Sequence, residues 1–122
     1  MKSYQELIVW QKSRVFVREI YLVTEKFPKA EIFGLTSQMR RSAVSIPSNI
    51  AEGFSRKHRK EWRQFLLIAF GSVAELETQL ILSRDLNFLS RDDFSRLIPF
   101  LGELGKMLNK MITNLNSSSA SG

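Results

Sequence analysis

Cysteine is absent from this chain of 122 residues, and histidine occurs only once, at His58. Without cysteine there is no disulfide framework, no thiolate metal site and no cysteine nucleophile. A single histidine argues against a histidine-based metal centre and against a serine-type catalytic triad. Gly-rich phosphate loops of the P-loop or dinucleotide type are also missing. We therefore expect a protein that is not an enzyme and has no catalytic, cofactor-binding or metal-binding residues.

Long apolar runs are missing as well, since no segment approaches the roughly 18 uninterrupted apolar residues of a membrane span. The N-terminal residues, MKSYQELIVWQK, have no small-residue cleavage site behind an apolar segment, so they do not read as a signal peptide. We expect a cytoplasmic protein without a membrane partner or a small-molecule substrate. The length suits one domain, placed at residues 1–115, and the low-complexity tail at 116–122 is predicted to be disordered.

Period-two alternation does not extend over any length of the chain, so sheets are not expected. Helical periodicity appears in four runs separated by short breaker signals. These runs cover about residues 5–27, 33–54, 59–86 and 94–115. Pro28 ends the first run, and Ser90 with Asp93 forms a variant of the capping box before the fourth. Four helices with short connections predict an all-α, antiparallel up-down four-helix bundle.

Two of the runs carry more apolar surface than one bundle core needs. The predicted core face of the first run consists of Leu7, Trp10, Val17, Ile20, Tyr21, Thr24 and Phe27. Apolar residues off the core faces are Ile8, Val9, Val15, Phe16, Leu22 and Val23 in the first run, and Leu67, Ile68, Phe70 and Ile81 in the third. A helix that is apolar around most of its circumference is buried on more than one side, so we expect a homo-oligomer with a helix-lined interface. Loosely scattered surface apolar residues are the alternative.

The net charge of +6 is unevenly distributed along the chain. Residues 1–63 hold thirteen Lys and Arg against six acids, whereas residues 64–122 hold five against six. Such asymmetry favours a polyanionic partner, above all nucleic acid. The predicted nucleic-acid-binding residues are Arg56, Lys57, Arg59, Lys60 and Arg63, helped by Arg40 and Arg41 if these are exposed.

The position of this basic run supports the binding interpretation over a merely solvated loop. It lies where the third helix is expected to begin, and cations are mildly unfavourable at a helix N-terminus. An arriving phosphate would reverse that preference, because backbone amides at the same end attract anions. Trp62 could stack on a base or anchor the core, and its helical spacing favours the core. For Arg40 and Arg41, a charge pair with Glu75 or Glu77 on the third helix is a further expectation.

The chain also resembles a known family. Residues 7–12 read LIVWQK, residues 27–53 read FPKAEIFGLTSQMRRSAVSIPSNIAEG, and residues 65–80 read FLLIAFGSVAELETQL. These motifs resemble the four-helix bundle proteins encoded in intervening sequences of bacterial 23S rRNA genes, and the resemblance extends from Leu7 to Leu115. It implies an antiparallel bundle that assembles as a ring-like homopentamer. Distant relatives of that family act as accessory proteins of reverse transcriptases in diversity-generating retroelements, and the family offers no catalytic residues to carry over.

Together these features predict a non-enzymatic, oligomeric protein that binds RNA, with rRNA as one candidate, or DNA. Binding is expected to be electrostatic and directed at the nucleic-acid backbone, with oligomerisation multiplying the basic surface. The alternative is a protein-interaction scaffold or accessory subunit, for example of a reverse transcriptase, with no direct role in nucleic-acid binding.

Overall fold

The computed structural model describes residues 3–121, with side chains as far as Leu115. The chain forms the α-helices α1 (Ile8–Thr24), α2 (Leu35–Arg56), α3 (Arg59–Asp85) and α4 (Arg91–Ser121), with short 3-10 helices η1 (Tyr4–Glu6) and η2 (Lys29–Glu31). No strand occurs among the described residues, so the predicted all-α class is confirmed. The disordered tail predicted at 116–122 lies outside the residues whose side chains are described.

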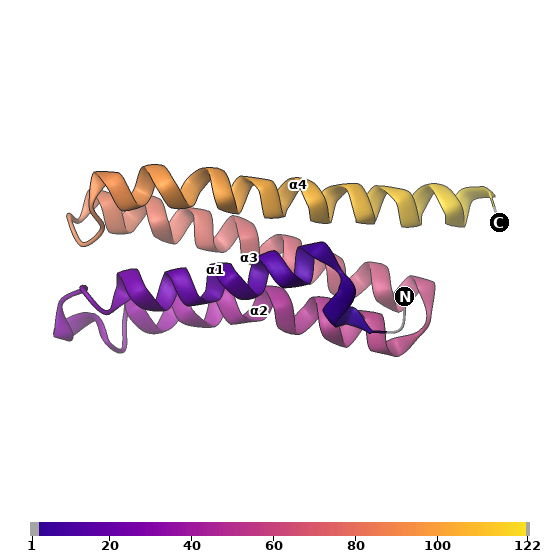
Figure 1. Cartoon of the computed structure of the whole chain (residues 1–122), viewed down its shortest axis with the longest axis horizontal. Helices are drawn as coiled ribbons and strands as arrows, with labels where there is room; N and C mark the ends of the chain where they lie inside the picture. The colour runs from indigo at the N-terminus through magenta and orange to yellow at the C-terminus, as the bar shows by residue number, and fades with distance from the viewer. Residues whose placement is uncertain (1–2, 122) are drawn as a thin grey trace.

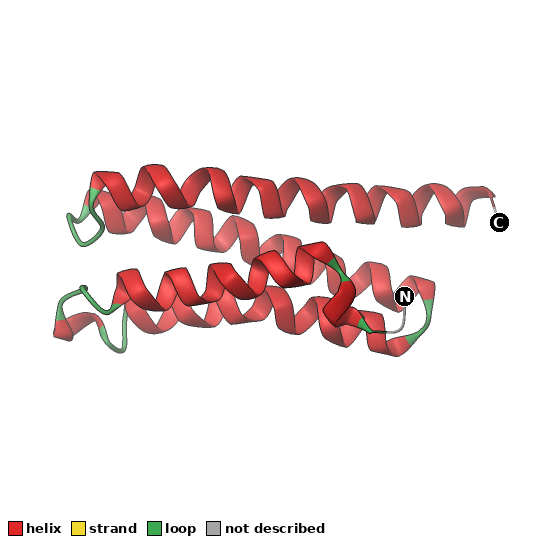
Figure 2. Ribbon diagram, viewed as in Figure 1, coloured by secondary structure: helices red, strands yellow, loops and turns green. Residues whose placement is uncertain are grey.

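Successive helices run up and down beside one another, and the connections gather at the two ends of the bundle (Figures 1 and 2). Both α2 and α4 pack against α1 and against α3, whereas the backbones of α1 and α3 do not approach each other closely within the described part of the chain. α1 and α3 therefore lie at diagonally opposite corners of the bundle, and their outer sides face in opposite directions.

The helix boundaries differ slightly from those expected. Ser3 Oγ accepts a hydrogen bond from Gln5 N and caps the separate turn η1, and the extended backbone at Leu7 then delays α1 until Ile8. At its other end α1 stops at Thr24, before a turn that carries the buried Phe27. The predicted cap of α4 is confirmed, because Asp93 N donates to Ser90 Oγ at 3.1 Å.

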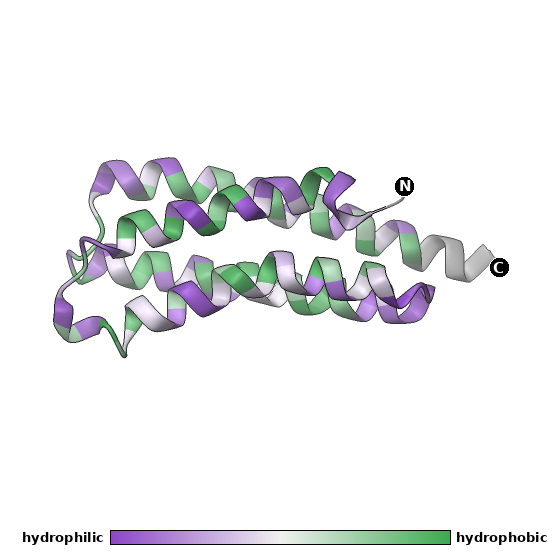
Figure 3. Ribbon diagram, turned by 60° about the horizontal axis from the view of Figure 1, so that its bottom comes forward, coloured by the Kyte–Doolittle hydropathy of each residue, from purple (hydrophilic) through white to green (hydrophobic). Residues whose placement is uncertain are grey.

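Apolar residues recur along every helix and converge on one core (Figure 3). The largest fully buried side chains are Phe16, Ile20, Met39, Ile46, Ile50, Leu66, Leu76, Leu80, Leu97, Leu101, Leu104 and Leu108. Burying one such side chain stabilises the fold by roughly 1.5–3 kcal/mol relative to leaving it in water. Buried apolar residues recur along most of the length of α2, α3 and α4.

The predicted core face of α1 is only partly correct. Ile20 and Thr24 are buried, as expected. Val9, Phe16 and Val23 are buried, although they were placed off that face, and Tyr21 is exposed. Apolar residues surround so much of α1 that periodicity cannot choose between neighbouring faces, and the choice depends on where α2 and α4 lie. The exposed residues that remain are Ile8, Val15 and Leu22, which we call the α1 strip. Their spacing of seven places them in line along the helix.

The outer side of α3 is apolar, as predicted. Its large apolar residues that are exposed are Leu67, Ile68, Phe70, Ile81 and Leu82, which we call the α3 outer face. Gly71 lies among them, and a Cβ built there would meet nothing within 4 Å. By length and composition alone α3 could also cross a membrane, with a mean hydropathy of 1.6 over a window that is 39% buried in the bundle. This hydropathy is high because α3 is apolar both on the side that faces the core and on its outer face.

Ion pairs fix the first turn of α4 against α1. Arg96 bridges Glu19 on α1 and Asp93 on its own helix, and Lys26 lies 3.7 Å from Asp93. Burial opposes ionisation of Asp93, but hydrogen bonds from Arg96 and Ser90 and the nearby positive charges outweigh it and lower its pKa. Lys12 and Glu103 form a second bridge between α1 and α4.

Candidate nucleic-acid interface

The basic run forms the tight connection between α2 and α3. α2 ends at Arg56 and is capped by Lys57, whose φ of 62° and ψ of 18° are left-handed, and His58 then returns to an extended conformation. We call residues 56–63 the basic turn. His58 provides no side-chain cap for α3, and the first helical bond runs from Trp62 N to His58 O at 2.8 Å. The backbone amides from Arg59 up to, but not including, that of Trp62 therefore lack helical partners and point out of the helix end.

Most cations of the basic turn are exposed. Arg56 donates to Glu52 Oε1 at 3.1 Å, and its guanidinium carbon lies 5.3 Å from the ring centre of Phe65. In contrast, Lys57, Arg59 and Lys60 are exposed and form no ion pair with any residue that the structure describes. Excess positive charge is therefore concentrated at this end of the bundle.

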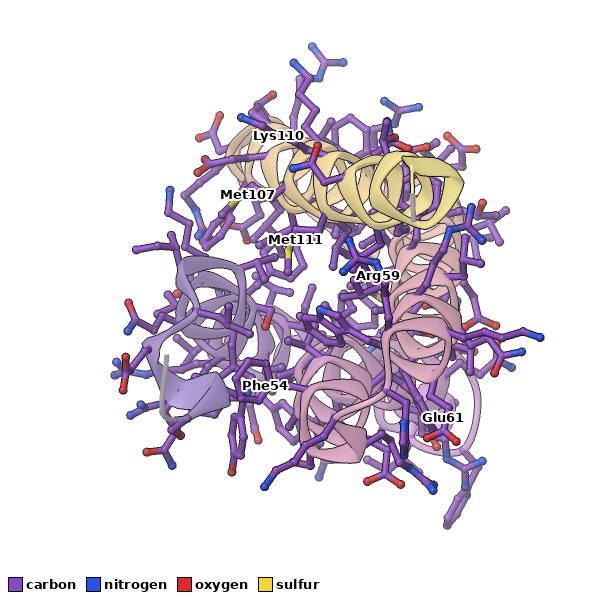
Figure 4. All side chains as sticks on the ribbon, turned by 90° about the vertical axis from the view of Figure 1, so that its right-hand side faces the viewer. Phe54, Arg59, Glu61, Met107, Lys110 and Met111 are labelled. Atoms are coloured by element: carbon purple, nitrogen blue, oxygen red, sulfur yellow. The ribbon has the colours of Figure 1, made fainter. Side chains whose placement is uncertain are left out.

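Arg63 differs from the other predicted binding residues. Its side chain is partly buried, and its Nε is shielded from solvent without a hydrogen-bond partner among the described residues. A buried donor without a partner is costly, so a group that accepts its hydrogen would be stabilising. In the end-on view, Arg59 lies toward the middle of this bundle end, whereas Glu61 lies on its outside (Figure 4).

Gly53 allows α2 and α3 to meet closely beneath the basic turn. A Cβ at Gly53 would lie 2.6 Å from Phe65 Cβ and 2.8 Å from Trp62 Cε3. Gly53 does not end α2, because Lys57 occupies the left-handed cap position. Gly53 therefore serves close packing of the two helices, and the Trp62 indole lies across the space that a side chain would fill.

A pocket of about 750 Å³ opens beside this contact. Its walls include Phe54 and Trp62, whose ring centres are 5.8 Å apart with planes at 82°. Tyr4 also lines the pocket. Its ring packs edge to face with that of Trp10, and the two ring centres are 5.3 Å apart. Lys57, His58 and Arg59 complete the lining. Trp62 packs against the core, as predicted, and also forms part of the pocket wall.

Arg40 and Arg41 do not join the basic turn. Sixteen residues of helix separate Arg40 from Arg56, a distance of about 24 Å along α2. Arg40 Nε donates to Thr24 Oγ1 at 2.9 Å, and its guanidinium carbon lies 4.5 Å from the Tyr21 ring centre. Arg40 thus holds α2 against α1, whereas Arg41 is exposed near the opposite end of the bundle.

The expected charge pair between α2 and α3 is not formed, and serine hydroxyl groups connect the two helices instead. Ser42 Oγ donates to Glu75 Oε1 at 2.9 Å, and the hydroxyls of Ser45 and Ser72 are 2.8 Å apart. Arg40 instead lies 3.7 Å from Glu25 beyond the end of α1. Within the described residues, no cluster of three or more His, Cys, Asp or Glu side chains could hold a metal ion.

The four-helix, all-α architecture with a basic turn at one end defines a small helical-bundle protein. Residues 5–110 match the family described as 23S rRNA-intervening sequence protein, and the chain belongs to that family. This confirms the family resemblance inferred from the RRSAVSIPSNIAEG segment at residues 40–53. The link to accessory proteins of reverse transcriptases stays a prediction.

A solved relative shares the fold. It is a crystal structure of a protein with unknown function from the S23 ribosomal protein family of Bacteroides thetaiotaomicron. The two chains are 26% identical, with a TM-score of 0.78, and the match covers 86% of this chain and 98% of the other. No curated protein matches the chain. The similarity therefore establishes a shared bundle architecture over nearly the full length of the relative.

Proposed function

We propose that this protein is a non-enzymatic, oligomeric nucleic-acid-binding protein that contacts RNA or DNA through the basic turn. The observation that carries the proposal is the group of exposed cations Lys57, Arg59 and Lys60, which have no ion pair among the described residues. Mutual repulsion and the positive end of the α3 dipole both oppose this grouping. A polyanion removes both penalties, and the free amides of the first turn add phosphate donors.

Contacts of this kind are directed at phosphates. Exposed Lys and Arg side chains without fixed partners bind backbone charge and carry little sequence information. Neutralising one phosphate with each of the five cations of the basic turn would give a slope of about −4.5 in log K against log salt on a duplex. Binding should therefore weaken steeply as salt rises.

We propose further that copies of the chain assemble head to tail. The α1 strip and the α3 outer face lie on diagonal helices, so one subunit carries two different apolar surfaces on opposite sides. Exposed Arg18 borders the first surface and exposed Glu77 the second, and neither has an ion pair within the described chain. Pairing unlike surfaces brings these opposite charges together, whereas pairing α3 with itself would bring Glu77 toward its own copy.

A head-to-tail contact repeats until it closes into a ring or extends as a filament. We favour a ring-like homo-oligomer, with a homopentamer as the assembly that the family resemblance implies. Each subunit would contribute one basic turn, so a single nucleic acid could engage several turns. The gain in avidity then comes from effective concentration and requires no further contact within a subunit.

The binding test removes charge at the basic turn. Changing Arg56, Lys57, Arg59 and Lys60 together to glutamine should abolish most binding to structured RNA in a low-salt titration. The matched control changes Lys26, Lys29, Arg91 and Lys106, which lose the same charge from exposed positions elsewhere. Because both variants have equal net charge, only a localised interface makes them differ.

Equal affinity of the two variants would place binding outside the basic turn and contradict the assignment. Absence of nucleic-acid binding in both variants and in the unchanged protein would contradict the function itself. In that case a defined protein partner that is captured after nuclease treatment, such as a reverse transcriptase, would identify a scaffold or accessory subunit.

A further inference from the structure

The pocket at the basic turn combines aromatic and basic side chains in one concave site. Tyr4, Phe54 and Trp62 supply rings, and Lys57, His58 and Arg59 lie on the same lining. Its volume of about 750 Å³ falls within the range of small-ligand sites, roughly 300–1,000 Å³. A purely electrostatic phosphate contact needs no such cavity and no aromatic walls.

The aromatic walls suit a flat ligand. Phe54 and Trp62 stand nearly perpendicular, at 82°, so a planar ring stacked on one of them presents its edge to the face of the other. Both arrangements are favourable for aromatic pairs. Gly53 fixes this corner, because the Trp62 ring lies against its Cα with no side chain between them. The Tyr4 hydroxyl has no hydrogen-bond partner among the described residues and can bond the edge of a base.

The basic side of the pocket suits a phosphate. Lys57 and Arg59 have no ion pairs in the described structure, and Arg59 lies toward the middle of the bundle end (Figure 4). The first-turn amides of α3 are free at the same place, because Trp62 N makes the first helical bond. A ligand with an aromatic ring and an attached phosphate therefore satisfies both sides of the pocket.

We infer that this pocket binds one unpaired nucleotide of a nucleic-acid strand, with its base in the corner that Phe54 and Trp62 form and its phosphate at Lys57 and Arg59. The inference rests on the proposed nucleic-acid-binding function and adds a preference for single-stranded segments over duplexes. In a duplex the faces of each base are covered by neighbouring bases, so only an unpaired base can stack on a protein ring.

Trp62 itself can report occupancy. The experiment uses a Trp10→Phe variant, in which Trp62 is the only tryptophan left. Phenylalanine at position 10 keeps a ring beside Tyr4. A short single-stranded oligoribonucleotide should quench Trp62 emission saturably, because the base stacks on or beside the indole. Inorganic polyphosphate should displace the strand from the basic turn without quenching. A nucleoside monophosphate serves as a third titrant and separates a free nucleotide from a strand.

A second variant removes one aromatic wall. Phe54→Leu should lower affinity for the single strand by about fivefold or more, the loss expected for one stacked base, and leave duplex affinity unchanged. The matched control is Phe88→Leu, a half-buried phenylalanine beside Phe27 at the other end of the bundle. Circular dichroism confirms that both variants remain helical.

The possible outcomes separate the pocket from the wider function. Salt-sensitive binding with equal affinity for strand and duplex, and with no Trp62 quenching, overturns the pocket while the basic turn stands. Quenching by the nucleoside monophosphate without any binding of the strand overturns the role of the pocket in strand recognition. No binding of any nucleic acid overturns the proposed function and the pocket together. Selective loss of single-strand affinity in Phe54→Leu supports both the pocket and the proposed nucleic-acid-binding function.

Discussion

Lys57 occupies a backbone conformation that suits glycine better than lysine. With φ at 62° it closes α2 in the left-handed region, which costs an L-residue about 1–2 kcal/mol. Helices commonly place glycine at this position. Retaining lysine here keeps a cation on the pocket lining at the expense of fold stability. The residue therefore links a local strain to the proposed binding surface.

Replacing Lys57 by glycine should separate stability from binding. We expect Lys57→Gly to raise the free energy of unfolding by about 1 kcal/mol, measured by urea denaturation, because the strain disappears. The same change should weaken nucleic-acid binding and reduce its salt slope by about 1, since one phosphate contact is lost. Asn87→Gly, at a φ of 64°, is the control. It should gain less stability, because asparagine tolerates this conformation, and should leave binding unchanged.

At the scale of the helix, Gly53 carries the contact between α2 and α3. We expect Gly53→Ala to destabilise the fold by about 1–3 kcal/mol in thermal or urea unfolding, because its Cβ would overlap Phe65 and Trp62. Gly102→Ala in α4 is the matched control, since a Cβ there meets nothing within 4 Å and alanine favours the helix by about 1 kcal/mol. If both substitutions stabilise the protein, the close approach at Gly53 is not a packing constraint.

The helices show how far sequence patterns reach. Breaker residues and caps predicted the helix boundaries to within three residues, because Pro28 and the Ser90 cap act locally. The exception is the end of α4, which was expected at 115 and lies at Ser121. The buried face of α1 was not predictable in the same way. Apolar residues lie around most of α1, so the positions of α2 and α4 decide which ones enter the core.

The candidate site also has features that the sequence predicted and features that it did not. The exposure of Lys57, Arg59 and Lys60 followed from their charge, since unpaired cations do not enter a core. The pocket did not follow, because Tyr4 reaches it from η1, about fifty positions before Phe54 in the chain. Arg40 was grouped with the basic run by charge alone, and the length of α2 separates them.

At the scale of the whole molecule, the α3 outer face has no partner among the described residues of its own chain. Gly71 lies in the middle of that face, where glycine weakens a helix by about 1 kcal/mol relative to alanine. No atom comes within 4 Å of its would-be Cβ, so packing inside the monomer does not explain it. A helix from another copy could approach closely at Gly71. The α1 strip, on the diagonal helix, is the surface that we expect to meet it.

The head-to-tail assembly can be tested by complementation. Val15→Glu alters the α1 strip and Ile68→Glu the α3 outer face, and both positions are about half exposed, at 53% and 51%, so the fold should tolerate either charge. Each variant alone should be monomeric in light scattering, because every head-to-tail contact uses both surfaces. Mixing the two should produce heterodimers only, because the intact α3 face of Val15→Glu can meet the intact α1 strip of Ile68→Glu. If α3 paired with itself, Val15→Glu would still dimerise and mixing would yield no heterodimer. Ser95→Glu, an exposed polar position on α4, should leave the assembly unchanged and controls for added charge.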